Sequence, residues 1–168
     1  TRKESSAASD VYKRQRVVGM EPEGAASLRA AFDHGGPVTL EDVDPFVDGA
    51  AVKRLGRLPY EILEANRERL SFDTVSEGAV CTDLLNLYQN EGIIAEPAGA
   101  LSVAGLHQLD LQPGSTVVCV ISGGNNDVLR YAEIMERSLV HRGLKHYFLV
   151  NFPQEPGPVS YTHLTLPT

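Results

Sequence analysis

The chain has 168 residues, a formal net charge of −7 and two cysteines. Its acidic balance argues against nucleic acid or an anionic membrane surface as the main partner, and no apolar run approaches the roughly 20 residues that a membrane-spanning helix needs. Because the two cysteines lack the spacing of a metal site, we expect free thiols, as is usual in the reducing cytoplasm.

One DNA segment can encode both ends of the chain. Residues 5–15 read SSAASDVYKRQ and residues 159–168 read VSYTHLTLPT. When the first is back-translated and its complementary strand is read in another frame, the second results, and the DNA matches the adapter of a transposon-type sequencing library. We therefore expect residues 1–15 and 158–168 to be adapter-derived and not native. The segment between them, residues 16–157, is expected to be a fragment of a longer protein.

The first half of this segment predicts two short strands separated by helices. The apolar run at residues 16–20 (RVVGM) is of strand type, and residues 24–32 (GAASLRAAF) predict a helix. Residues 39–42 (TLED) have the spacing of a helix N-cap followed by an acidic first turn. Residues 59–70 (PYEILEANRERL) are amphipathic and predict a helix, and residues 72–75 (FDTV) predict a short strand.

The second half predicts helices over residues 77–92, 97–109 and 126–143, and strands over residues 116–121 and 146–152. Ser76 has the character of a helix N-cap, and Gly143 of a helix terminator. The uniform apolarity of residues 116–121 (TVVCVI) predicts a fully buried strand. Strands that alternate with helices predict an α/β protein with a mostly parallel sheet.

A glycine-rich turn follows the most apolar of these strands. In such sheets, ligands bind at the carboxyl ends of the strands, which selects residues 122–127 (SGGNND) and the residues from Glu21 onward. The backbone N–H groups of SGGNN can face an anion at a helix N-terminus. The same residues can equally form a tight turn in which Asn126 or Asp127 caps the next helix. The pattern is neither a Walker loop nor a dinucleotide-binding loop.

Two further positions are candidates on pattern alone. Glu96 comes just before a predicted helix, where a carboxylate is favoured by the helix dipole whether or not it has a function. Asp48 and Gly49 can form a simple turn. None of the histidines has a partner at catalytic or metal-binding spacing, so the residue pattern supplies no complete active site.

Five segments, in this order and at this spacing, resemble the biosynthetic threonine ammonia-lyase (threonine dehydratase) family of tryptophan-synthase-β-like, pyridoxal-phosphate enzymes. They are GMEPEGAAS (19–27), VDGAAVKRLG (47–56), IIAEPAGALSVAGL (93–106), VVCVISGGNND (117–127) and GLKHYFLVNFPQEPG (143–157). SGGN and EPAGA are shared with serine racemases and serine dehydratases, whereas DGAAVKR together with HYFLVNFPQ is more specific. The resemblance covers essentially all of residues 16–157.

The resemblance implies an α/β fold, namely part of the three-layer, mostly parallel sheet of the fold type II enzymes. Residues 16–143 would be the later part of the catalytic domain. Residues 144–157 would begin an ACT-like regulatory domain with its first strand, and in this family that domain responds to isoleucine. The family also implies a cytoplasmic protein that assembles as a homotetramer.

The implied activity is α,β-elimination of L-threonine to 2-oxobutanoate and ammonia, with pyridoxal 5′-phosphate as cofactor, in isoleucine biosynthesis. The protein's task is to orient the reactants and tune the cofactor. A serine dehydratase or serine racemase is the alternative within the superfamily, and HYFLVNFPQ argues against it. A nucleotide-binding or regulatory module is the alternative from another class, and the absence of GK[ST] after the turn argues against it.

The resemblance assigns the cofactor contacts to six residues, Ser122, Gly123, Gly124, Asn125, Gly49 and Glu96. The serine would hydrogen-bond the pyridine nitrogen, the next three residues would shape the ring edge, Gly49 would line the site with its backbone, and Glu96 would lie near the ring. Because a neutral hydroxyl does not hold a pyridinium as an aspartate would, the ring is a weaker electron sink, which suits elimination better than transamination.

The catalytic residues themselves are expected outside the chain. In this family the Schiff-base lysine, the substrate-carboxylate loop and the phosphate loop precede the position of Arg16, so the isolated chain is expected to be inactive. Glu21 and Ala25 match cation-binding positions of serine racemase. The third ligand there is an aspartate and here is Ser27, which argues against a divalent cation. An incomplete sheet is also expected to leave apolar strand edges exposed.

Overall fold

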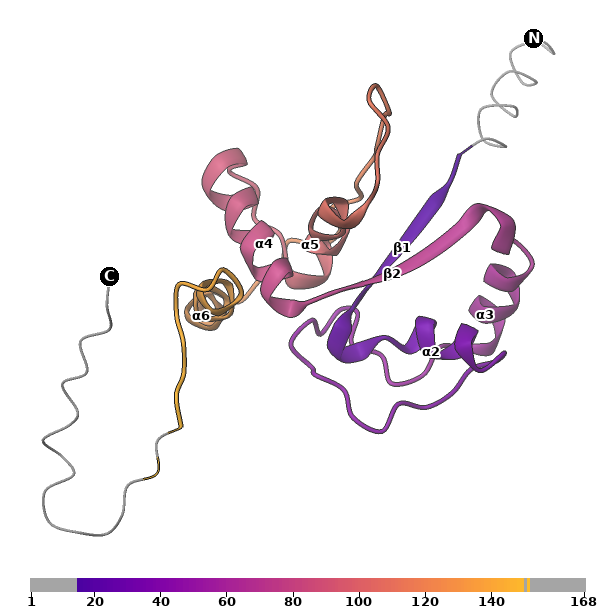
Figure 1. The fold of residues 1–168 in the computed structure, drawn as a ribbon, viewed down its shortest axis with the longest axis horizontal. Helices are drawn as coiled ribbons and strands as arrows, with labels where there is room; N and C mark the ends of the chain where they lie inside the picture. The colour runs from indigo at the N-terminus through magenta and orange to yellow at the C-terminus, as the bar shows by residue number, and fades with distance from the viewer. Residues whose placement is uncertain (1–14, 150, 152–168) are drawn as a thin grey trace, which may run out of the picture.

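The computed structural model describes residues 15–149 and 151. Its elements, with η marking 3-10 helices, are β1 (Val17–Pro22), η1 (Glu23–Ala25), α2 (Ser27–Asp33), α3 (Arg57–Glu64), η2 (Arg67–Arg69), β2 (Leu70–Val75), α4 (Glu77–Glu91), α5 (Pro97–Ala104), η3 (Gly105–Gln108), η4 (Val128–Arg130) and α6 (Tyr131–His141). In the view of Figure 1, α2 and α3 lie on one side of the two strands and α4, α5 and α6 on the other. Of the two ends predicted to be adapter-derived, residues 1–14 and 158–168 lie outside the described residues.

The two strands form a parallel pair, as the α/β pattern predicts. Val17 pairs with Leu70 and the register continues without a bulge to Pro22 and Val75. Parallel neighbours require a long crossover, and here α2 and α3 lie within it. The ring of Phe32, from α2, lies 4.7 Å from that of Phe72 in β2, which packs the crossover against the sheet. The strands predicted at residues 16–20 and 72–75 are therefore confirmed.

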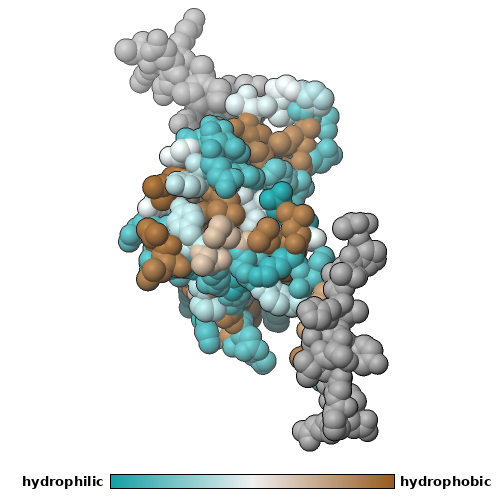
Figure 2. Space-filling view, turned by 90° about the vertical axis from the view of Figure 1, so that its left-hand side faces the viewer, coloured by the Kyte–Doolittle hydropathy of each residue, from teal (hydrophilic) through white to brown (hydrophobic). Residues whose placement is uncertain are grey.

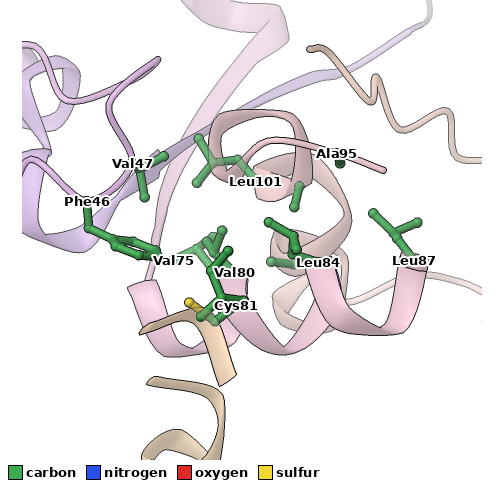
Figure 3. Close-up of a cluster of buried hydrophobic side chains, with 12 residues drawn as sticks. Phe46, Val47, Val75, Val80, Cys81, Leu84, Leu87, Ala95 and Leu101 are labelled. Carbon is green, nitrogen blue, oxygen red and sulfur yellow. The ribbon is translucent and has the colours of Figure 1, made fainter. Parts of the chain in front are cut away.

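The main hydrophobic core lies between α4, α5 and α6. Figure 3 shows its side chains converging from α4, from the loop that carries Phe46 and Val47, and from the end of β2 at Val75. Leu84 of α4 and Ile134 of α6 are fully buried. Since α5 is built almost entirely of small residues, its backbone can approach its neighbours closely.

The helix ends follow local chemistry. The Oγ atom of Ser76 accepts a hydrogen bond from the Ala79 N–H at 3.3 Å, which is the predicted N-cap of α4. Gly92 ends α4 in the left-handed region, with φ of 68°. Asp127 accepts from the Leu129 N–H at 2.9 Å and so caps η4, one of the two caps that the sequence left open. Gly143, with φ of 67°, follows α6 as predicted.

Two predicted strands are wrong in the part of the chain that the structure describes. Residues 116–121 have no regular structure, and Val118 and Val120 are 84% and 70% exposed, so the segment is not the buried strand that its apolarity predicts. Residues 146–149 are likewise irregular, with Leu149 95% exposed, and most of residues 150–157 lie outside the described residues. A strand requires a neighbour for its backbone N–H and C=O groups, and the only described sheet consists of β1 and β2.

Several predicted helices also differ from the structure. The α-helical parts of those predicted over residues 97–109 and 126–143 are shorter, since α5 ends at Ala104 and α6 begins at Tyr131. Two other predictions differ because of contacts with distant segments. Residues 39–42 form no helix; the Leu40 N–H instead donates to the Lys53 carbonyl at 2.9 Å. The helix predicted over residues 59–70 is α3, which begins at Arg57 and ends at Glu64, while Leu70 is the first residue of β2. In both cases, tertiary pairing overrides a local pattern.

Apolar residues consequently reach the surface, as expected for an incomplete sheet. Figure 2 shows them in several separate groups on the face it presents. Within the described range, no helix combines the length and apolarity that crossing a membrane would require.

Candidate functional site

The SGGNND turn lies against the N-terminus of α5. The Glu96 N–H donates to the Gly123 carbonyl at 3.3 Å, and Glu96 is the N-cap position of α5. Gly123 has φ of 73°, and a Cβ atom added there would lie 2.2 Å from the Glu96 carboxylate. Only glycine tolerates both this backbone conformation and this approach. The turn and Glu96, predicted separately, therefore form one site.

Gly49 reaches the same carboxylate from a distant loop. A Cβ atom added at Gly49 would lie 3.3 Å from Oε1 of Glu96 and 2.9 Å from the Cβ of Ala98. Gly49 and Gly123 thus approach Glu96 with their backbones. Ser122, Gly124 and Asn125 belong to the same turn and are exposed. The structure brings all six predicted cofactor-binding residues together.

Gly99 is a member of this site that the sequence reasoning missed. A Cβ atom on Gly99, in the first turn of α5, would lie 1.9 Å from the Ser122 carbonyl oxygen. Position 99 therefore has no room for a side chain, because the turn crosses α5 there. The signal was present in the sequence, because EPAGA is rich in small residues, but small residues alone predict close packing without naming the partner.

Glu96 argues against a phosphate in the turn. Its carboxylate lies directly beside Gly123, so an anion cradled by these N–H groups would have this carboxylate as a close neighbour. A flat, largely uncharged ring edge meets no such repulsion. The residue pattern left an anion-binding turn and a simple tight turn open, and the neighbouring carboxylate argues against the first.

A buried polar atom lies beside the turn. The Asn126 side chain donates through Nδ2 to the Ala95 carbonyl at 3.4 Å, while its Oδ1 atom is buried and has no hydrogen-bond partner within residues 15–149 and 151. Buried acceptors are nearly always satisfied in complete proteins. This acceptor is therefore suited to a donor supplied by a bound group, by water or by another segment.

Glu21 has a structural role in α2. Its carboxylate accepts the N–H groups of Leu28 at 2.6 Å and Arg29 at 2.9 Å, so it caps the helix that Ser27 begins. Burial raises the pKa of Glu21 more than these N–H groups lower it. Ala25, the other weak metal candidate, is fully buried. Among the residues that the structure describes, no three acidic, histidine or cysteine side chains are grouped to hold a metal ion.

Each lysine in the described part of the chain is either paired with a carboxylate or exposed to solvent. Lys145 pairs with Glu136, with Nζ 2.6 Å from Oε2. Lys53 is exposed. A separate hollow of about 430 Å³ is lined by α4, η3 and α6 and not by the SGGNND turn. In it Asp83, only 6% exposed, contacts Nε2 of His107 at 3.2 Å.

A model of the family described as pyridoxal-phosphate dependent enzymes matches residues 5–123, which include Ser122 and Gly123. The chain is 68% identical over 153 residues to the L-threonine dehydratase biosynthetic IlvA of Corynebacterium glutamicum, covering 91% of this chain and 35% of that protein. It is 70% identical over 141 residues to the protein of the same name from Mycobacterium leprae, covering 84% of this chain and 33% of that protein. The chain therefore spans about a third of the length of these curated relatives.

Solved structures of similar fold include the processed form of threonine deaminase isoform 2 from Solanum lycopersicum. That match has a TM-score of 0.67 and 24% identity, and covers 77% of this chain and 38% of the other. A crystal structure of the T.th. threonine deaminase matches with a TM-score of 0.55 and 30% identity, over 67% of this chain and 37% of the other. Maize serine racemase matches with a TM-score of 0.59 and 24% identity, over 76% and 40% of the two chains.

Proposed function

The chain belongs to the pyridoxal-phosphate-dependent enzyme family, and from that premise we propose that the whole protein is a threonine ammonia-lyase. It converts L-threonine to 2-oxobutanoate and ammonia. The observation that carries the proposal is the identity of 68–70% to two proteins named biosynthetic L-threonine dehydratase, over 84–91% of the chain. Identity at this level supports the threonine enzyme over the serine enzymes, of which maize serine racemase is 24% identical.

The residues present suit the cofactor. Pyridoxal phosphate, when bound, supplies an electron sink for the negative charge that develops at the substrate Cα. The turn offers it an exposed serine hydroxyl and glycine backbone, which lets a flat ring approach closely. Gly49 and Glu96 line the same place from two other segments. The buried Oδ1 atom of Asn126 leaves an unpaired acceptor beside the turn, which is compatible with a further group there.

Ser122 is the residue that sets the ring's electronics in this proposal. Its hydroxyl would donate to the pyridine nitrogen and would leave that nitrogen uncharged, since a serine has no negative charge with which to hold a proton there. Glu96, behind Gly123, is placed near the ring but without the direct approach of the serine. The expected consequence is a bias toward elimination and against transamination.

The isolated chain is proposed to be inactive. The Schiff-base lysine and the phosphate loop belong to a part of the whole protein outside this segment, in keeping with the third of its relatives' length that the chain spans. Lys145 is held by Glu136, and Lys53 lies in an exposed loop. Neither lies in a sequence context that resembles the family's lysine motif.

Regulation and assembly are part of the same proposal. Residues 144–157 begin an ACT-like domain through which isoleucine inhibits the whole enzyme, and the enzyme is a cytoplasmic homotetramer. The sequence GLKHYFLVNFPQEPG supports the regulatory assignment. The word biosynthetic in the relatives' names supports a role in amino-acid synthesis.

The test begins with the full-length gene product. Purified with pyridoxal phosphate, it is expected to show the absorbance of a lysine-bound cofactor near the visible edge, and to form 2-oxobutanoate from threonine faster than pyruvate from serine. Absence of cofactor binding, or a preference for serine, overturns the assignment. The 168-residue chain under the same conditions is expected to give no turnover. Borohydride-fixed cofactor on the chain together with threonine turnover would overturn its proposed inactivity.

The role of Ser122 is tested in the same full-length protein. Ser122→Ala is expected to weaken cofactor binding by about tenfold, the equivalent of one lost hydrogen bond to a ring nitrogen. Ser122→Asp is expected to increase the ratio of transamination to elimination, because a carboxylate stabilises the protonated ring. Ser115→Ala, in an exposed turn before the same segment, is the matched control. If Ser122→Asp leaves the product ratio unchanged, the hydroxyl does not set the ring's electronics.

A further inference from the structure

One arginine connects the loop that carries Gly49 to the segment that follows the turn. Arg130, the last residue of η4, donates through Nη2 to the Phe46 carbonyl and through Nη1 to Oδ2 of Asp48 at 3.3 Å. Its guanidinium lies 5.0 Å from the centre of the Phe46 ring. Its side chain is 24% exposed, so these contacts are partly shielded from water. Three contacts thus hold the loop of residues 44–49 at one end.

Asp48 connects Arg130 to Gly49 through its two carboxylate oxygens. While Oδ2 receives Arg130, Oδ1 accepts the N–H of Gly49 at 2.9 Å. One carboxylate therefore fixes both the arginine and the peptide N–H that leads into Gly49. Since Gly49 lies against Glu96 and Ala98, the orientation of this peptide decides how closely the loop approaches the site.

We propose that Arg130 is a positioning residue, which acts through Asp48 to hold the Gly49 backbone at the cofactor site. The inference rests on the proposed function for its consequence and on the described contacts for its geometry. Arg130 follows the SGGNND turn closely in the chain, and Asp127 caps the 3-10 helix that presents it. A single side chain therefore connects the segment after the turn to the Gly49 loop.

A second arginine provides an internal comparison. Arg137 of α6 stacks on the same Phe46 ring, with its guanidinium 4.2 Å from the ring centre. It pairs with Oδ2 of Asp44 at 3.0 Å, at the opposite end of the loop from Gly49. Both arginines thus contact one ring and pair with an aspartate of the same loop, and they differ in which end of the loop they hold. If Arg130 had a merely structural role, replacing either arginine would affect the Gly49 peptide similarly. If Arg130 positions Gly49, only its replacement should affect that peptide.

An exposed ion pair on its own contributes little to folding. Asp48 is 68% exposed, so its pair with Arg130 is screened by water. The effect of losing Arg130 is therefore expected in the local order of the Gly49 peptide more than in global unfolding. The contact of Arg137 with Asp44 is better shielded, since both side chains are 33% exposed, and its loss is expected to affect unfolding more.

The first experiment needs no cofactor. Hydrogen exchange of the Gly49 amide is measured by nuclear magnetic resonance in the 168-residue chain. Arg130→Met and Asp48→Ala are each expected to accelerate that exchange by about tenfold, as for one charge-assisted hydrogen bond, and Arg130→Lys by less. Arg137→Met is expected to leave the Gly49 exchange rate within about twofold of wild type, because it pairs with Asp44 and not with Asp48. Equal acceleration in the Arg130 and Arg137 variants, or none in Arg130→Met, overturns the proposal.

The second experiment uses the full-length enzyme with its cofactor. Arg130→Met is expected to raise the dissociation constant of pyridoxal phosphate by about tenfold and to shift the absorbance of the bound cofactor. Arg137→Met is expected to lower the urea midpoint while leaving both unchanged. The same change of dissociation constant in the two variants overturns the positioning role. If the wild-type enzyme takes up no cofactor, the proposed function fails, and the exchange rates of the Gly49 amide still decide whether Arg130 positions it.

Discussion

Replacing Gly99 by alanine tests whether the crossing of α5 and the SGGNND turn shapes the site. The added methyl group would lie 1.9 Å from the Ser122 carbonyl oxygen and 3.0 Å from that of Gly123. Both obstacles are backbone atoms, so no side-chain rotation can relieve the overlap. Either α5 or the turn has to move.

The magnitude follows from two opposing effects. Ordinary contact begins near 3.4 Å, so the overlap with Ser122 requires a displacement of about 1.5 Å. Overpacking of this kind costs roughly 1–3 kcal/mol. Alanine is also the better helix former, which offsets up to about 1 kcal/mol of that cost. The expected net change is a loss of about 1–2 kcal/mol in the free energy of unfolding.

The assay is urea unfolding of the chain, followed by circular dichroism, together with the cofactor dissociation constant of the full-length protein. With a urea slope of about 2 kcal/mol/M, the midpoint should fall by roughly 0.5–1 M, and cofactor affinity should fall with it as the turn is displaced. Gly36→Ala is the control, because no heavy atom lies within 4 Å of the methyl group that it would add. If Gly99→Ala unfolds at the wild-type midpoint with unchanged affinity, the close crossing does not shape the site.

Three further predictions concern stability and reactivity. Ser76→Ala should reduce the unfolding free energy by about 1 kcal/mol through loss of the α4 N-cap, and Ser76→Asn by less, as measured by urea midpoints. Burial opposes ionisation of Asp44, but hydrogen bonds from the Phe46 N–H and the Arg137 guanidinium outweigh burial and lower the pKa of Asp44. Ionised Asp44 therefore stabilises the folded chain above pH 3.8, and this stabilisation is lost as the pH falls through the lowered pKa of the folded state. Burial raises the pKa of Glu21 above 4.5, so ionised Glu21 destabilises the folded chain and protonation in acid removes that destabilisation. Urea midpoints measured from about pH 3 to 6 should therefore depend less steeply on pH in Asp44→Asn and more steeply in Glu21→Gln. Burial also raises the pKa of Cys81 to about 12, so a thiol reagent should modify Cys119 first and Cys81 only on unfolding; fast modification of both in the folded chain would contradict the described core.

The elements found correctly from the sequence are those with signals within a few residues. A serine before an acidic turn predicted the start of α4, and the glycine at position 92 ended it in the left-handed conformation. The two short apolar runs predicted β1 and β2. The family resemblance, which depends on five local segments, singled out the SGGNND turn, Glu96 and Gly49, and the structure shows that these lie together. Capping, turn geometry and periodicity involve neighbours in the chain, so they can be read before the chain folds.

Contacts between distant segments were decided by the tertiary structure alone. The apolarity of residues 116–121 could not show that no strand lies beside them in the described chain. Nothing local to Gly49 predicted that it meets Glu96, nor did the small residues of α5 name the carbonyl of Ser122 as their neighbour. In the sequence, Arg130 is only one more charge on an amphipathic segment, and its pairing with Asp48 is visible only in the folded chain. Sequence patterns report the preference of each residue for a conformation or for burial, whereas the identity of the group it meets depends on how the whole chain packs.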